Sequence, residues 1–276
     1  MSLLEKIYNV LDYQIKAPSA YGPFHLASIL IVAFTTLFLL LAFKNCDEKT
    51  ERKIAMIFWI IIVVLEIYKQ LDYSISFDEG KLVWDYRWFI FPFQFCSTPL
   101  YALPFIIFSK SKKVREAFIS FIGTYSLFAG LAVFAYPNDV FTPTLGIDIQ
   151  TMIHHGTQII LGIFFVVKRF KSENPPTKKS WILSATLVFA AFASTAILLD
   201  VIGYHTLTAF NIDETFNLFF ISPYFDCTLP ILSLIYKVVP YPIFLAIYLL
   251  GFAAAAFLVL IIMTAIFARS NKSKIN

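Results

Sequence analysis

Polar and ionisable side chains interrupt several long apolar stretches of this sequence, in positions that a membrane interior would make costly. Such residues are candidates for binding or catalysis, because burying them in hydrocarbon is unfavourable unless they have partners or a role. The candidates are His25, Glu66, Lys69, Gln94, Cys96, His154, His155, Gln158 and Asp200, with Asn217 in a later connection.

Seven apolar runs must position these residues. Each is close to the ~20 residues that a helix needs to cross ~30 Å of hydrocarbon. Because lipid offers no hydrogen-bond partners to a lone strand, the runs are predicted to be helices. They are Phe24–Phe43, Ile54–Tyr73, Phe89–Phe108, Phe118–Tyr136, Ile149–Val167, Trp181–Ile202 and Tyr241–Phe267. The predicted fold is an all-α polytopic membrane protein with seven transmembrane helices.

The composition supports this class. Apolar residues make up 59% of the chain and charged residues 14%, against about 25% charged in soluble domains. The 31 Phe and 14 Tyr are too many for one water-soluble core of this size. We therefore expect membrane lipid as the surrounding partner and no nucleic-acid partner, cofactor or metal.

Basic residues predict the orientation. The connections after the first, third and fifth runs, with the tail after the seventh, contain 16 of the 22 Lys and Arg, whereas the opposite side has five. The positive-inside rule then places the N-terminus outside and the C-terminus inside a cell membrane. No secretory signal peptide is expected, so insertion would rely on the first span.

Three regions follow from this topology. Residues 1–23 form an outer N-terminal segment, in which helical spacing of apolar residues over 1–18 indicates an interfacial helix. Residues 24–267 form a single seven-helix membrane domain, and 268–276 a cytoplasmic tail. The long outer connection 203–240 contains the apolar pieces Leu218–Tyr224 and Leu229–Val239, of which the second is too short to span and is predicted to be re-entrant or interfacial.

The candidates gather at one depth. Gln94 and Cys96 lie about 10 Å below the outer boundary at 1.5 Å per residue, and His154, His155 and Gln158 lie at an equivalent depth. His25 opens the first helix and Asp200 ends the sixth, whereas the inner halves of the helices contain almost nothing comparable. The pattern predicts a polar cavity that opens near the outer face.

Each candidate also has a structural interpretation. Glu66 and Lys69, three residues apart on one helix, could simply neutralise each other. Cys96 could be an ordinary buried thiol. A disulfide between Cys96 and Cys227 is disfavoured, since it requires their Cα atoms to lie within ~7 Å.

Three short stretches carry a family resemblance. They are Phe-Pro-Phe-Gln-Phe-Cys-Ser at 91–97, Ile-His-His-Gly at 153–156 and Phe-Asn-Leu-Phe-Phe-Ile-Ser-Pro at 216–223. With the helix count, the chain resembles the YwaF family of bacterial integral membrane proteins. That family is distantly similar to a eukaryotic acyltransferase that moves polyunsaturated chains onto ether phospholipids.

The resemblance implies roles for particular residues. Cys96 matches an acyl-accepting nucleophile, His155 its His partner, with His154 as an alternative match, and Asn217 matches an Asn that precedes a Pro. A buried thiol is a poor nucleophile, and an imidazole can activate it by taking its proton. Acyl transfer from a phospholipid or other acyl donor would then pass through a thioester on Cys96, with the oxyanion stabilised by Asn217, Gln94 or a loop N–H. The residues expected to line the substrate pocket are His25, Glu66, Lys69, Gln94, Gln158 and Asp200.

Two other functions remain open. A transporter or receptor would bind a small solute with Glu66, Lys69 and the Pro-interrupted loop 203–242. A zinc-dependent lipid hydrolase would use His25, His154, His155 or His205 with Asp200, although these spacings match no compact zinc motif. A retinal protein is disfavoured because the seventh helix has no Lys.

Overall fold

The computed structural model describes residues 3–78 and 80–272 and is mostly helical. Within those residues, six helices are long and apolar enough to cross a membrane. They are α2 (Pro23–Phe43), α3 (Glu48–Ser74), a continuous helix over Lys112–Ala135, α7 (Leu145–Phe170), α8 (Lys178–Ala209) and α10 (Tyr241–Lys272). This confirms the prediction of a helical chain with several potential membrane spans.

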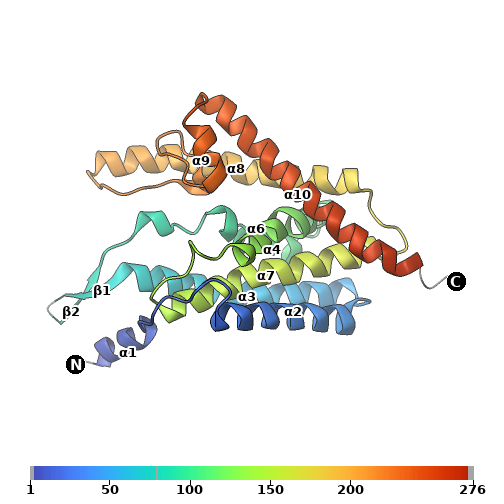
Figure 1. Cartoon of the computed structure of the whole chain (residues 1–276), viewed down its shortest axis with the longest axis horizontal. Helices are drawn as coiled ribbons and strands as arrows, with labels where there is room; N and C mark the ends of the chain where they lie inside the picture. Colours follow the sequence, from blue (N-terminus) through green and yellow to red (C-terminus); the bar gives the residue numbers. More distant parts are fainter. Residues whose placement is uncertain (1–2, 79, 273–276) are drawn as a thin grey trace.

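Helix α7 forms the centre of the bundle. It packs against α2, α3, α6 (Leu127–Ala135) and α10, while α8 lies on the far side of α6 in Figure 1. Of the six long helices α7 is the least apolar and the most deeply buried. A polar helix of this kind is best placed where other helices shield it from lipid, because each exposed polar group in hydrocarbon is costly.

The third predicted helix, Phe89–Phe108, is not continuous. Its first half contains only the 3₁₀ turns η1 (Trp88–Ile90) and η2 (Phe95–Ser97), and the α-helix α4 covers Pro99–Phe108. Pro92 and Pro99 explain the break: Pro92 keeps Phe91 out of helical geometry, and Pro99 has no N–H to donate to the preceding turn, so it can only begin a helix. The prediction of one unbroken helix here was wrong.

The broken segment nevertheless runs antiparallel to α3 over most of that helix. Gln70 Nε2 donates to the carbonyl of Ile90 at 2.8 Å, Trp59 Nε1 to that of Leu100 at 2.9 Å, and Arg52 Nη2 to that of Ser109 at 2.8 Å. At 1.5 Å per residue, the part of α3 from Arg52 to Gln70 is about 27 Å long. These side chains satisfy main-chain carbonyls along a segment that is only partly helical.

Small residues bring α6 close to α7. Helix α5 (Lys112–Phe121) passes through a π-helical turn, η3 (Ile122–Ser126), into α6. A Cβ atom at Gly130 would lie 2.7 Å from the carbonyl oxygen of His155, and one at Gly162 would lie 2.7 Å from Cβ of Leu127. Only glycine permits this approach, so α6 fixes the position of α7 at His155.

Shorter elements complete the fold. Helix α1 (Leu3–Leu11) occupies the N-terminal segment, so a helix is present where one was expected. Strands β1 (Ile75–Asp78) and β2 (Lys81–Trp84) form an antiparallel hairpin, and the connection before α10 holds η4 (Leu218–Phe220) and α9 (Pro230–Tyr236). Of the predicted tail, 268–272 continues α10, and 273–276 lies outside the described residues.

Candidate functional site

A cavity of about 250 Å³ lies between the end of α3, the segment 89–97, the loop 139–142 and the first half of α7. Six of the residues singled out from the sequence line it together, namely Glu66, Lys69, Gln94, Cys96, His154 and His155. They come from three segments far apart in the chain. The prediction that these polar residues share a pocket is therefore supported for these six.

The main chain at Cys96 is held by α7. His154 Nε2 lies 2.9 Å from the carbonyl oxygen of Cys96, and Gln158 Nε2 donates to the same oxygen. The two side chains are four residues apart, so they project from the same face of α7. This arrangement positions the thiol of Cys96, which belongs to η2, at the cavity wall.

The hydrogen bonds of the two histidines define their neutral tautomers. His155 Nδ1 lies 2.8 Å from the carbonyl oxygen of Thr151, and a carbonyl can only accept, so neutral His155 must carry its proton on Nδ1. Its Nε2 then has a free lone pair and makes no hydrogen bond to any residue that the structure describes. By the same reasoning, neutral His154 carries its proton on Nε2, which faces Cys96.

Glu66 and Lys69 form an ion pair of 2.8 Å at the cavity wall. Gln70 Nε2 also donates to Glu66 Oε1, at 2.7 Å, while Oε2 of Glu66 is buried without a partner among the described residues. Tyr86 donates to Gln70 Oε1 at 3.0 Å. Burial first, and then the nearby Glu66 carboxylate, raise the pKa of the Tyr86 phenol, so it remains a donor at neutral pH.

Asn217 and Asp200 lie outside this cavity and instead hold the loop between α8 and α10 in place. Asn217 Nδ2 donates to the carbonyl of Asp226 at 3.0 Å, and its Oδ1 accepts from the N–H of Ser222 at 3.0 Å. Asp200 Oδ1 accepts from the N–H of Leu218 at 2.7 Å. These bonds stabilise a strained loop, since Phe219 and Phe220 both have positive φ angles.

Gln94 connects the loop to the cavity. Its Nε2 donates to the carbonyl of Asn217 at 3.1 Å and its Oε1 accepts from the N–H of Phe219 at 3.0 Å. One hydrogen of the Gln94 amide remains available for a further acceptor. Asn217 does not line the cavity itself; its main-chain carbonyl instead orients Gln94, which does.

His25 is fully buried, and it does not line this cavity. Its Nδ1 accepts from the N–H of Tyr21 at 3.0 Å, and its ring packs against Phe134 and Phe141. Gln158 also does not line the cavity, although it reaches the Cys96 main chain. The substrate-binding role predicted for His25 and Asp200 has no support from their positions.

The cysteines and potential metal ligands can be placed as well. Cys46, Cys96 and Cys227 are all free thiols. In the described part of the chain, no three His, Cys, Asp or Glu side chains are grouped as a metal site. His205, one of the proposed zinc ligands, instead lies 3.2 Å from the hydroxyl of Tyr224.

Several residues that line the cavity were not identified by the sequence analysis. Asp139 and Thr142 come from the loop before α7, while Gln150 and Thr151 belong to α7 itself. Gln150 and Thr151 precede His154 and His155 by four residues each, and helical spacing could have identified them. The loop residues carried no comparable signal.

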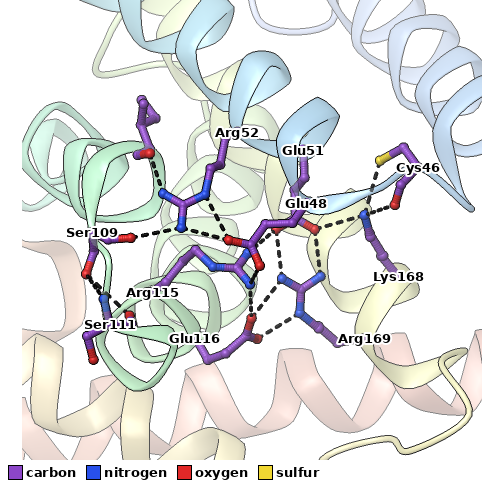
Figure 2. A network of polar contacts seen from close by, with 11 residues as sticks. Cys46, Glu48, Glu51, Arg52, Ser109, Ser111, Arg115, Glu116, Lys168 and Arg169 are labelled. Carbon is purple, nitrogen blue, oxygen red and sulfur yellow. Dashed lines mark hydrogen bonds and ion pairs between the residues drawn. The ribbon is translucent and has the colours of Figure 1, made fainter.

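A second polar cluster lies at the opposite end of the bundle, and its members all fall just outside the predicted apolar runs. Glu51 is 1% exposed and pairs with Arg115 at 2.8 Å, Arg169 at 2.7 Å and Lys168 at 3.1 Å (Figure 2). Glu116 accepts from Arg169 Nε at 2.7 Å. The network ties together the starts of α3 and α5 and the end of α7.

No family model matches the chain, and neither a curated protein nor a solved structure matches it. The fold and cavity define a helical protein with several potential membrane spans, consistent with a multi-pass membrane protein. The resemblance to the YwaF family stays a prediction that rests on the three short stretches.

Proposed function

We propose that this protein is a membrane-embedded enzyme that transfers or hydrolyses the acyl ester of a lipid through Cys96. The observation that carries the proposal is that Cys96 and His155 line one cavity, with the Nε2 lone pair of His155 free. A thiol and a neutral imidazole that line the same cavity are the two groups that cysteine acyl transfer requires. This assignment of Cys96 and His155 agrees with the roles implied by the resemblance to the YwaF family.

The reaction would proceed in two balanced steps. His155 Nε2 removes the thiol proton, and the thiolate attacks the ester carbonyl, forming a C–S bond. The C–O bond then breaks, and His155 returns the proton to the departing alcohol. In the second step His155 activates water or another alcohol, which attacks the thioester and regenerates the thiol.

The cavity offers donors for the negative charge that develops on the carbonyl oxygen. The remaining amide hydrogen of Gln94 and the ammonium of Lys69 both belong to residues at its wall. Losing one oxyanion donor commonly costs about 10²–10³ in rate. Asn217 would be a positioning residue in this scheme, because it holds the carbonyl that orients Gln94.

The proposed topology has seven crossings of the cell membrane, with the N-terminus outside and the C-terminus inside. The antiparallel course of 90–109 along α3 supports a crossing by this broken segment. Shared ion pairs between the starts of α3 and α5 support a return of the chain to the same side. The Lys and Arg bias would make that side cytoplasmic, so the Cys96 cavity would open outwards.

A labelling experiment tests the nucleophile. Purified protein is treated with a lipid-like thiol-reactive probe, alongside Cys96→Ala, His155→Gln and a Cys46→Ala/Cys227→Ala double variant. Labelling should be lost in Cys96→Ala, slowed in His155→Gln and retained in the double variant. Persistent labelling of Cys96→Ala would contradict the assignment of Cys96.

A second candidate function is a transporter or receptor for a small solute. The Glu66–Lys69 ion pair favours this function, because both residues line the cavity and Oε2 of Glu66 has no partner among the described residues. In that case Cys96→Ser should retain solute binding, whereas Glu66→Gln should lose it. An enzyme that depends on Cys96 should show loss of turnover in Cys96→Ser.

A further inference from the structure

A cavity of about 530 Å³ lies at the end of the bundle opposite Cys96, beside the network in Figure 2. It is formed by α5, the end of α7 and the start of α8. Its charged lining residues are five cations and three glutamates: Lys112, Lys113, Arg115, Lys168, Arg169, Glu48, Glu51 and Glu116.

All three glutamates already form ion pairs with arginines of the network. Glu51 and Glu116 share Arg115 and Arg169, and Glu48 accepts from Arg115 at 2.8 Å. The lysines at the start of α5, Lys112 and Lys113, are exposed and form no ion pair with any described residue. The cavity therefore has an excess of positive charge that its own carboxylates do not neutralise.

Two buried donors in the lining also lack partners. Arg115 and Trp181 are each 4% exposed, and neither Arg115 Nε nor Trp181 Nε1 has a hydrogen-bond partner within the described residues. Both atoms can only donate, so an acceptor is what would satisfy them. An unsatisfied buried donor is unfavourable, which makes a bound acceptor the simplest complement.

The remaining lining favours an oxyanion with several acceptor oxygens. Of the serines that line the same space, Ser120, Ser172 and Ser180 already donate their hydroxyl hydrogens to main-chain carbonyls, whereas the hydroxyl of Ser184 makes no hydrogen bond among the described residues. Lys112 and Lys113 occupy the first turn of α5, where main-chain N–H groups point outwards and the helix dipole favours negative charge. Guanidinium, ammonium, hydroxyl and indole donors together match the oxygens of a phosphate group.

From these observations we propose that this cavity binds a phosphate group, carried either by an anionic lipid headgroup or by a free phosphate ion. The site is separate from the Cys96 cavity and does not depend on the function proposed for it. Lys112 and Lys113 would attract the anion, and the free donors of Arg115 and Trp181 would hold it inside.

The test uses the full-length protein and two sources of phosphate. Binding of inorganic phosphate is measured by calorimetry and by the shift in melting temperature in a neutral detergent. Lipid binding is measured with phosphatidylcholine nanodiscs that do or do not contain phosphatidic acid. Binding of phosphate alone would identify a free-anion site, and binding only of phosphatidic acid would identify a headgroup site; both outcomes support the proposal.

Variants distinguish a built site from general attraction to positive charge. Lys112→Ala/Lys113→Ala should weaken binding about tenfold or more, because a charge-assisted hydrogen bond is worth roughly that factor. Trp181→Phe keeps the ring but removes the donor and should also weaken binding. Lys178→Ala/Lys179→Ala removes two exposed lysines outside the lining and should bind normally.

Two results would overturn the proposal. One is the absence of binding to both phosphate and phosphatidic acid in a protein with a cooperative melting transition. The other is equal weakening by the two lysine pairs together with normal binding by Trp181→Phe. Replacing Arg115 is avoided, since it also pairs with Glu51 and its loss would disturb folding.

Discussion

Replacing Gly130 with alanine should disturb the cavity through the main chain of His155. The added Cβ would lie 2.7 Å from the His155 carbonyl oxygen and 2.9 Å from Cβ of Gln158. Ordinary contact begins near 3.4 Å, so α7 must move by about 0.7 Å at this point. Because Gln158 holds the Cys96 carbonyl, the displacement would reach both members of the proposed pair.

The magnitude can be set against a matched control. Overpacking a well-packed interior typically costs about 1–3 kcal/mol. Gly251 lies within α10, and a Cβ there meets nothing within 4 Å. Both substitutions gain the same helix preference of alanine, so their difference in free energy of unfolding should equal the packing cost, about 1–3 kcal/mol.

The assay is thermal or denaturant unfolding of the two variants, combined with the rate of Cys96 labelling by the thiol probe. A misplacement on the order of 1 Å can cost about 10²-fold in rate, so a 0.7 Å displacement should slow labelling roughly tenfold or more. Gly251→Ala should label at the normal rate. If Gly130→Ala proved as stable and as reactive as Gly251→Ala, the close contact between α6 and α7 would not position the site.

Two further substitutions test the polar framework. Glu51→Gln should lower the free energy of unfolding by about 3–5 kcal/mol, because it leaves buried cations without their carboxylate. Glu48→Gln changes a half-exposed side chain and should lower it by no more than about 1 kcal/mol. Equal melting temperatures of the two variants would contradict this expectation. Asn217→Ala should leave the buried N–H of Ser222 unpaired, cost about 1–3 kcal/mol and speed amide exchange at 217–226. Unchanged exchange would show that Asn217 does not brace the loop.

The apolar pattern predicted the long helices well, apart from their ends. The predicted span Ile54–Tyr73 corresponds to α3 at Glu48–Ser74, and Trp181–Ile202 corresponds to α8 at Lys178–Ala209. Each helix extends beyond its apolar window because its polar ends continue the same backbone hydrogen bonding. A hydropathy window measures the length that lipid could cover, whereas a helix ends where its carbonyls and N–H groups find other partners.

The segment 89–108 shows what hydropathy alone could not predict. Its side chains are as apolar as those of a helix, yet Pro92 and Pro99 divide it. Main-chain groups are left without helical partners, and polar side chains satisfy them: Gln70 at Ile90, and His154 and Gln158 at Cys96. The prolines were visible in the sequence, but the packing of α3 and α7 against this segment, which supplies these partners, was not.

The cluster around Glu51 was missed for a different reason. Its basic residues were used to predict orientation, and a count of charges treats each of them as solvated. Their burial depends on the starts of α3 and α5 meeting the end of α7, which is a property of helix packing. No local spacing links Glu51 to Arg115 or Arg169.

Both polar regions depend on α7, and this explains why the least apolar helix is central. Its first half carries His154 and His155 at the small cavity, and its last turn carries Lys168 and Arg169 beside the large one. A helix on the lipid face could not hold such residues without exposing them to hydrocarbon. Surrounded by α2, α3 and α6, α7 can bear them at both ends, and the close contact at Gly130 fixes its position against α6.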